Sequence, residues 1–156
     1  QSPAGLLRIS GTADYISEVS FCDSLEKIPA RKKQVPPLLI HCVEQLIQYF
    51  NGERRVFELA LHQEGTPFQQ EVWSELLQIP FGKTISYLEL ARRTGDTKAT
   101  RAVANANGKN HIAIIVPCHR VIGSNGDLIG YAGGLWRKKK LLELENKVAY
   151  GVQTLF

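Results

Sequence analysis

One stretch, Ile112-Ala-Ile-Ile-Val-Pro-Cys-His-Arg-Val-Ile122, organises the chain. An apolar run leads to Pro117-Cys118-His119-Arg120, and a short apolar pair leads away from it toward an Asn-Gly turn at 125–126. Runs of β-branched residues bounded by proline and by turn residues are typical of buried extended chain. We therefore expect Cys118 to stand at the end of a rigid, dry segment, where its thiol can be aimed as a nucleophile.

The neighbours of Cys118 decide whether it is reactive, because a lone cysteine in apolar surroundings is ordinarily a small buried hydrophobe. His119 and Arg120 favour the thiolate and would lower the thiol pKa from about 8.5. Pro117 fixes one backbone angle beside the sulfur. Asn110, just before the run, can orient groups near the thiol by hydrogen bonding. Together these residues favour a functional thiol.

Composition excludes several classes of protein. The chain of 156 residues is 44% hydrophobic, as in an ordinary globular protein, and has no long apolar run and no basic-apolar leader. We therefore expect no membrane partner. The three cysteines, Cys22, Cys42 and Cys118, suggest no disulfide framework, which indicates a reducing compartment: the cytoplasm, or the nucleus in a eukaryote. Cys and His residues lack the paired spacing of zinc ligands, and we expect neither a metal nor a cofactor.

The charge is unevenly distributed. Residues 1–65 hold 7 Lys and Arg against 8 Asp and Glu, whereas residues 66–156 hold 12 against 7. The basic half also carries Cys118. A basic half suggests a polyanionic partner, although a charged face is more often merely solvated.

The first part of the chain predicts a small α+β unit. Residues 5–22 alternate loosely and suggest short antiparallel strands, and Pro36-Pro37 opens an amphipathic helix over 38–50. A further strand is predicted over 57–61. We assign residues 1–65 to an N-terminal α+β scaffold domain.

The second part predicts a mainly helical domain over residues 66–156, so that the fold class is α/β, more closely α+β. Thr66 is a good N-cap with Gln69 completing a capping box, and Ser86 and Asp96 or Thr97 are further caps. The helices are predicted over 68–79, 87–93, 98–107 and 136–146. The second and third form a helix-turn-helix pattern.

The helix predicted over 98–107 is thin. Four alanines line it, and Arg101 is its one long side chain in mid-helix. A thin helix approaches a groove closely, which favours shape or minor-groove binding over base readout by long side chains, although helix propensity alone also explains alanine. We expect DNA contacts at Thr97, Lys98, Arg101, Ala102 and Arg120.

These residues resemble a known family. The Pro117-Cys118-His119-Arg120-Val121 run, with Asn110, Arg101, Tyr87, the Tyr131–Leu135 loop and Glu145 in matching order and spacing, is similar to the DNA repair alkyltransferases that act on 6-O-alkylguanine. The resemblance covers residues 66–146 well and the first unit only in general layout.

The resemblance implies a role for each matching position. Cys118 would accept the alkyl group, His119 would act as its base through a water, and Glu145 would orient His119. Asn110 would hydrogen-bond near the thiol, and Tyr87 would donate a hydrogen bond or a proton to the guanine. The Arg101 side chain would insert into the base stack in place of a flipped nucleotide. The substrate pocket would be lined by Tyr131, Ala132, Gly133 and Val121.

The implied reaction is transfer of a methyl or other alkyl group from 6-O-alkylguanine, with 4-O-methylthymine as a further substrate, in double-stranded DNA. It would be stoichiometric, because no residue here cleaves a thioether, and the protein would act as a monomer. Three positions depart from the family pattern. His111 and Ala113 stand where prolines are common, and Ala132 stands where some members have serine.

Two alternatives remain open at this point. A non-catalytic helix-turn-helix protein would bind DNA or mark damage reversibly, with no covalent change at Cys118. A cysteine hydrolase would pair Cys118 with His41, His62 or His111 and turn over, but no oxyanion-site motif is recognisable.

Overall fold

The computed structural model describes residues 1–23 and 34–151, which form two compact units. The first comprises Gln1–Gln63 with His111–Ala113, and the second comprises Glu64–Asn110 and the chain from Ile114 onward. The segment 111–113 belongs to the first unit because Ile112 pairs in parallel with Val19. Most of the loop expected between the first sheet and the first helix lies outside the described residues.

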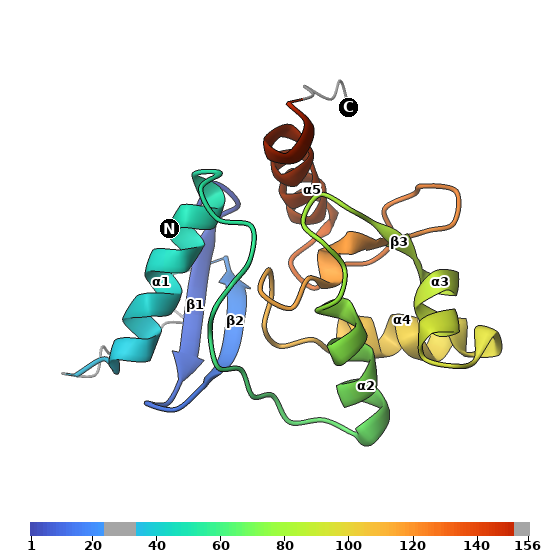
Figure 1. Ribbon diagram of the computed structural model, residues 1–156, viewed down its shortest axis with the longest axis horizontal. Helices are drawn as coiled ribbons and strands as arrows, with labels where there is room; N and C mark the ends of the chain where they lie inside the picture. The colour runs from blue at the N-terminus through green and yellow to red at the C-terminus, as the bar shows by residue number, and fades with distance from the viewer. Residues whose placement is uncertain (24–33, 152–156) are drawn as a thin grey trace. The chain divides into compact units, whose positions relative to one another are not determined.

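The first unit is a β-hairpin with a helix packed on it (Figure 1). Strand β1 (Leu6–Gly11) pairs antiparallel with β2 (Ile16–Cys22), and the register places Leu7 opposite Phe21. Helix α1 (Pro37–Phe50) is amphipathic, as predicted, and buries Cys42, Leu46 and Tyr49, whereas Val43 and Ile47, which were expected on the buried face, are exposed. The strand predicted over 57–61 is not formed; only an isolated parallel bridge joins Leu61 to Ile16.

The second unit is helical, with one small parallel pair of strands. Its elements are α2 (Pro67–Leu76), β3 (Ile85–Ser86), α3 (Tyr87–Arg93), the 3-10 turn η2 (Thr97–Ala99), α4 (Thr100–Gly108), the 3-10 turn η3 (Cys118–Arg120), β4 (Val121–Ile122) and α5 (Leu135–Tyr150). Helix α4 packs against α2 and α3, and β3 pairs with β4 (Figure 1). The α+β class predicted from the sequence is therefore correct.

Helix starts in the second unit follow the predicted caps. The Thr66 side chain accepts from the backbone N–H of Gln69, whose side chain accepts in return from Thr66, which completes the capping box. Ser86 caps α3, and Asp96 accepts from Lys98 N–H at the start of η2. The single helix predicted over 98–107 is instead a 3-10 turn followed by α4. In the described ranges, no helix is both long enough and apolar enough to cross a membrane.

Candidate active site

The segment that delivers Cys118 is buried, as predicted, but it is not a strand. Ile112, Ile114, Ile115 and Val116 are all buried, yet Ile114 has a φ of 72°. A β-branched residue rarely adopts this left-handed conformation, so the surrounding packing must impose it. The Asn110 side chain braces the turn, since its Nδ2 donates to the Val116 carbonyl at 2.9 Å. Cys118 then opens η3 and is 7% exposed.

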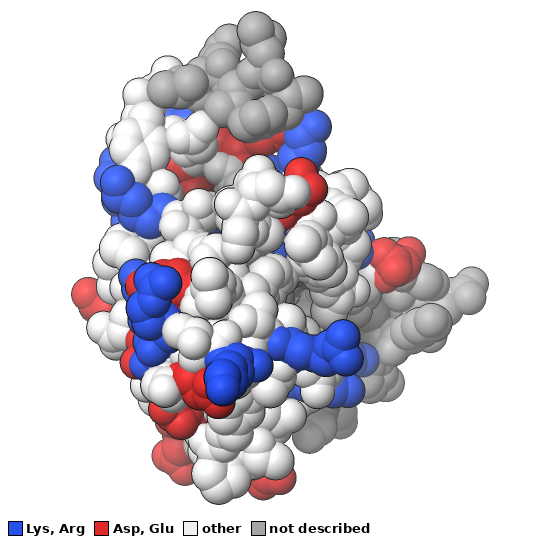
Figure 2. All heavy atoms as spheres, turned by 90° about the vertical axis from the view of Figure 1, so that its right-hand side faces the viewer, with Lys and Arg blue, Asp and Glu red and all other residues white. Residues whose placement is uncertain are grey.

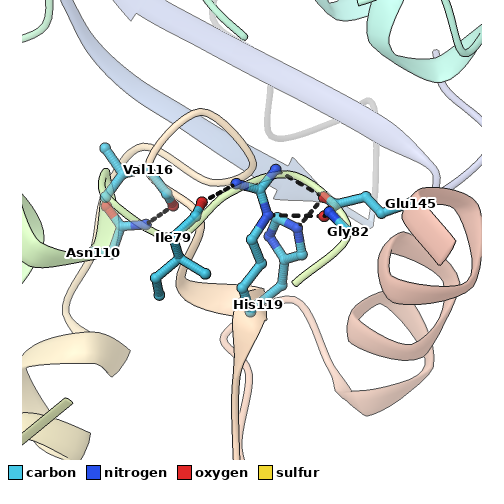
Figure 3. A network of polar contacts seen from close by, with 7 residues as sticks. Ile79, Gly82, Asn110, Val116, His119 and Glu145 are labelled. Carbon is cyan, nitrogen blue, oxygen red and sulfur yellow. Dashed lines mark hydrogen bonds and ion pairs between the residues drawn. The ribbon is translucent and has the colours of Figure 1, made fainter. Parts of the chain in front are cut away.

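His119 and Arg120 both turn toward Glu145 on α5. His119 Nε2 and Glu145 Oε2 lie 2.5 Å apart, and Arg120 Nε donates to Glu145 Oε1 at 2.8 Å. Figure 3 shows this convergence, with Gly82 N–H also donating to the carboxylate. The side chains of His119, Arg120 and Glu145 are almost fully buried. Helix α5 therefore joins the two residues that follow Cys118 in one closed ion-pair network.

Charge pairing overcomes burial at Glu145. Burial by itself would raise the pKa of this carboxyl, but the charges and hydrogen bonds of His119 and Arg120 hold it well below its ordinary range. The carboxylate therefore stays ionised and fixes His119 through Nε2. The other ring nitrogen, Nδ1, is buried and has no hydrogen-bond partner among the described residues. That nitrogen is the one left for proton transfer.

Cys118 lies in the wall of a cavity of about 560 Å3. The cavity is formed within the second unit by α3, α4 and the loop before α5. Its walls comprise Tyr87, Thr100, Arg101, Ala104, Asn107, Gly108, Asn110, Cys118, Ile129, Gly130, Tyr131 and Ala132. A second cavity of similar volume, which includes Asp127, Lys139 and Glu143, has no cysteine among the residues that line it. The cavity at Cys118 is therefore the candidate site, and its volume is that of a typical small-molecule pocket.

Tyr87 and Lys138 donate to the same backbone carbonyl at one wall of this cavity. The Tyr87 hydroxyl donates to the Ile129 carbonyl at 2.9 Å. Lys138 Nζ donates to the same carbonyl at 3.0 Å, to the Gly130 carbonyl at 3.2 Å and to the Tyr87 oxygen at 3.5 Å. Burial lowers the pKa of Lys138 to about 8, although an ionised Cys118 opposes the shift. A buried ammonium thus holds the loop that forms the cavity wall.

Burial raises the pKa of the Cys118 thiol, and the side chains of Asn110 and Lys138 oppose that shift. The sequence pointed instead to His119 and Arg120 as the groups that favour the thiolate. Both side chains bind Glu145, which compensates the charge of Arg120, and this explains the difference. Burial also raises the pKa of Tyr87, as does an ionised Cys118, whereas a hydrogen bond from Asn107 lowers it.

The structure brings most of the predicted site residues to the cavity and leaves some elsewhere. Tyr87, Asn110, Cys118, Tyr131 and Ala132 line it, whereas His119 and Glu145 lie behind Cys118 in the ion-pair network. Two predicted pocket residues do not line it. Val121 is fully buried in β4, and the Gly133 carbonyl accepts from Arg137.

The predicted DNA-contact residues divide in the same way. Thr97 and Lys98 in η2 are exposed, as are Arg101 and Ala102 in α4, and Arg101 also lines the cavity. Figure 2 shows the side of the molecule that lies on the right in Figure 1, where basic side chains lie among acidic ones. Arg120 differs from the prediction: it is buried, and its guanidinium donates to Glu145 and to the Ile79 carbonyl. It is therefore a structural residue of the ion-pair network and not a surface contact.

Two polar residues of the site were missed. Lys138 lies in a basic run, which is usually a solvated surface. It is nevertheless three residues before Leu141 and seven before Glu145, so helical periodicity places it on their buried face. Asn107 shares the buried face of α4 with Val103. Its neighbours in sequence carry no signal of its role.

Two family models match the chain in sequence order. Residues 1–63 match the ribonuclease-like domain of 6-O-methylguanine DNA methyltransferase, and residues 67–147 match its DNA binding domain. The methylated-DNA–protein-cysteine methyltransferase of Mycobacterium tuberculosis is 46% identical over 99% of this chain and 94% of its own length. The constitutive enzyme of that name from Bacillus subtilis is 41% identical over 96% and 94%.

Solved structures resemble this one over nearly the whole chain. The crystal structure of Mycobacterium tuberculosis OGT in complex with DNA has a TM-score of 0.85 and 44% identity, covering 95% of this chain and 91% of that one. An O6-methylguanine DNA methyltransferase from Methanococcus jannaschii has a TM-score of 0.69 and 25% identity, covering 94% and 91%.

Proposed function

The chain belongs to the 6-O-methylguanine DNA methyltransferase family, and we propose that it repairs DNA by moving the alkyl group of 6-O-alkylguanine onto Sγ of Cys118. The observation that carries this proposal is a free cysteine in the wall of a cavity, backed by a buried His–Glu pair. We assign DNA binding and alkyl acceptance to residues 66–156 and a scaffold role to residues 1–65. Free thiols at Cys22, Cys42 and Cys118 fit a cytoplasmic location.

The base must leave the duplex stack to reach Cys118, at a cost of a few kcal/mol. Arg101 is suited to offset that cost because it is exposed on α4 and also lines the cavity. Its side chain would enter the stack while the extruded base occupies the cavity. Thr97, Lys98 and Ala102 present the rest of the same surface to the DNA backbone.

Proton transfers accompany the transfer of the alkyl group. His119 would take the thiol proton at Nδ1 through a water, while Glu145 holds Nε2 and balances the imidazolium. The sulfur then forms a bond to the alkyl carbon as the carbon–oxygen bond breaks. The electron pair of the broken carbon–oxygen bond stays on the guanine. Guanine is a better leaving group when it accepts a proton or a hydrogen bond.

Tyr87 is suited to supply that hydrogen bond. Its hydroxyl donates to the Ile129 carbonyl in this structure, so it must turn toward the base. The turn leaves no buried acceptor stranded, because Lys138 also donates to the same carbonyl. Asn110 would meanwhile keep Cys118 in place and favour its thiolate. The thioether product is stable, so each molecule would react once.

Intact mass decides the proposal. After incubation with a duplex oligonucleotide that carries 6-O-methylguanine, the protein is expected to gain the mass of one methyl group. Cys118→Ser should gain none. Cys22→Ser, which alters a half-buried cysteine of the first unit, should still be methylated. An unchanged mass for the folded wild type, with its thiol still titratable, would contradict the proposal.

A further inference from the structure

The turn that follows α2 makes closer contact with α5 than turn geometry requires. Residues 80–83 form a four-residue turn, closed by the Lys83 N–H donating to the Pro80 carbonyl at 3.1 Å. Gly82 occupies the third position with a φ of 77°, as a type II turn demands. The turn explains this backbone conformation, but it does not explain how near the backbone of Gly82 lies to α5.

Both polar backbone groups of Gly82 bind side chains of α5. Its N–H donates to Glu145 Oε1 at 3.2 Å (Figure 3), and its carbonyl accepts from the Tyr150 hydroxyl at 3.1 Å. A Cβ at residue 82 would lie 2.7 Å from Cβ of Ala149, which is closer than two non-bonded carbon atoms approach each other. Glycine is therefore needed here for the close approach as well as for the positive φ.

The N–H of Gly82 distinguishes the two oxygens of the Glu145 carboxylate. Arg120 bridges both, since its Nε donates to Oε1 and its other terminal nitrogen donates to Oε2 at 3.2 Å. Gly82 binds Oε1, whereas His119 binds Oε2. A donor fixed on Oε1 holds the plane of the carboxylate, so that Oε2 stays directed at the imidazole.

The second cavity gives this contact a further consequence, because both Gly82 and Glu145 line it. Glu145 is nevertheless only 1% exposed. If the turn moved away from α5, water from this cavity would replace the N–H at the carboxylate. An ion pair that becomes solvated is weaker, because the effective dielectric constant around it rises.

We propose that Gly82 is a positioning residue for the reaction of Cys118: its backbone N–H orients the Glu145 carboxylate toward His119. The absence of a Cβ is what allows this N–H to reach Glu145 past Ala149. The inference rests on the proposed function, in which Glu145 holds His119 as the base. It adds the group that holds Glu145 itself.

A clash that a second substitution can relieve tests the inference. Gly82→Ala pushes the turn away from Ala149 and should slow methyl transfer to Cys118, followed by intact mass, by about tenfold to a hundredfold, as when one hydrogen bond to a charged group is lost. Gly82→Ala combined with Ala149→Gly should recover most of that rate. Thermal unfolding shows whether each variant is folded.

The matched control is Gly126→Ala. Gly126 has a φ of 87°, but a Cβ there meets open space, so this variant imposes similar backbone strain and should keep the wild-type rate. A double-mutant cycle then shows whether Gly82 acts through Glu145. In Glu145→Gln, which lacks the negative charge, adding Gly82→Ala should slow transfer little further.

Three results would overturn the inference: a wild-type rate in Gly82→Ala, no recovery when Ala149→Gly is added, or an equal proportional loss in the Glu145→Gln background. Each of them leaves the proposed function intact, because the wild type still transfers the methyl group. Absence of transfer by the folded wild type would instead refute the proposed function and the inference with it.

Discussion

Two buried charges on the same face of α5 are compensated in opposite ways. Glu145 meets His119 and Arg120, so that its charge is paired on both oxygens. Lys138, seven residues earlier and fully buried, meets only neutral oxygens of Ile129, Gly130 and Tyr87 in the part of the chain that the structure describes. The negative charge of Glu145 is therefore compensated by a neighbouring cation. The positive charge of Lys138 has no anionic partner among the described residues.

The difference in compensation appears in both pKa values. Pairing outweighs burial at Glu145 and lowers its pKa, which fixes the charge. Burial outweighs the other influences at Lys138 and lowers its pKa to about 8, which loosens the hold on its proton. A lysine poised in this way responds to a new anion nearby, and an ionised Cys118 is such an anion. We infer that Glu145 maintains the structure and the geometry of His119, whereas Lys138 supports the chemistry.

Removing a charged partner of Glu145 should have the largest effect on the free energy of unfolding. Arg120→Met removes one partner and leaves Glu145 buried with part of its charge uncompensated, at a cost of about 3–5 kcal/mol in the free energy of unfolding. Urea denaturation measures this loss. Arg93→Met is the matched control, because Arg93 pairs with Glu89 on the surface, where such pairs contribute about 0–1 kcal/mol. Similar losses in the two variants would show that the buried network is not special.

Low pH should weaken the ion-pair network around Glu145. The folded-state pKa of Glu145 lies below its unfolded-state value of about 4.3, so the unfolded state binds more protons as the pH falls past that value. The contribution of Glu145 is therefore complete above the unfolded-state pKa and is lost as the pH falls toward the folded-state pKa. Thermal unfolding from pH 6 to pH 3 should show a shallower loss of stability in Glu145→Gln than in the wild type. Parallel curves for the two proteins would assign the acid sensitivity to other carboxyls.

Much of this architecture was predictable from local sequence. The caps at Thr66 and Ser86, the position of helix α1 and the family motif around Cys118 follow from signals that act over a few residues. Long-range pairing was not predictable. Residues 57–61 have the composition of a strand, but only Leu61 forms a bridge to Ile16. The left-handed Ile114 contradicts the propensity of a β-branched residue, and only tertiary packing explains it.

The site was predicted in its reactive residues and missed in the residues around them. Cys118 and His119 stand out because adjacent residues define a motif. Lys138 and Asn107 do not, since their roles come from burial and from which atoms they face. Arg120 is a predicted DNA contact, but its ion pair with Glu145, twenty-five residues away in sequence, holds it in the interior.

Changing Lys138, whose charge meets only neutral oxygens among the described residues, should have a smaller effect, on the reactivity of Cys118. Lys138→Met keeps the length of the side chain and removes the charge, so the pKa of Cys118 should rise and its thiol should react more slowly with iodoacetamide near neutral pH. Lys140→Met, on the exposed side of α5, is the matched control and should match the wild type. The rate of alkylation at Cys118, measured by mass against pH, gives the comparison.

Stability against pH separates an electrostatic role of Lys138 from a purely structural one. Its folded-state pKa of about 8 lies below the ordinary value of 10.5, so the unfolded state holds more protons between these values. Wild-type stability should gain a rising contribution from Lys138 as the pH increases through that window, and Lys138→Met should lack it. If the two proteins showed the same pH dependence and the same thiol reactivity, Lys138 would be only a brace for the Ile129–Gly130 loop, and the contrast between the ends of α5 would lose its chemical meaning.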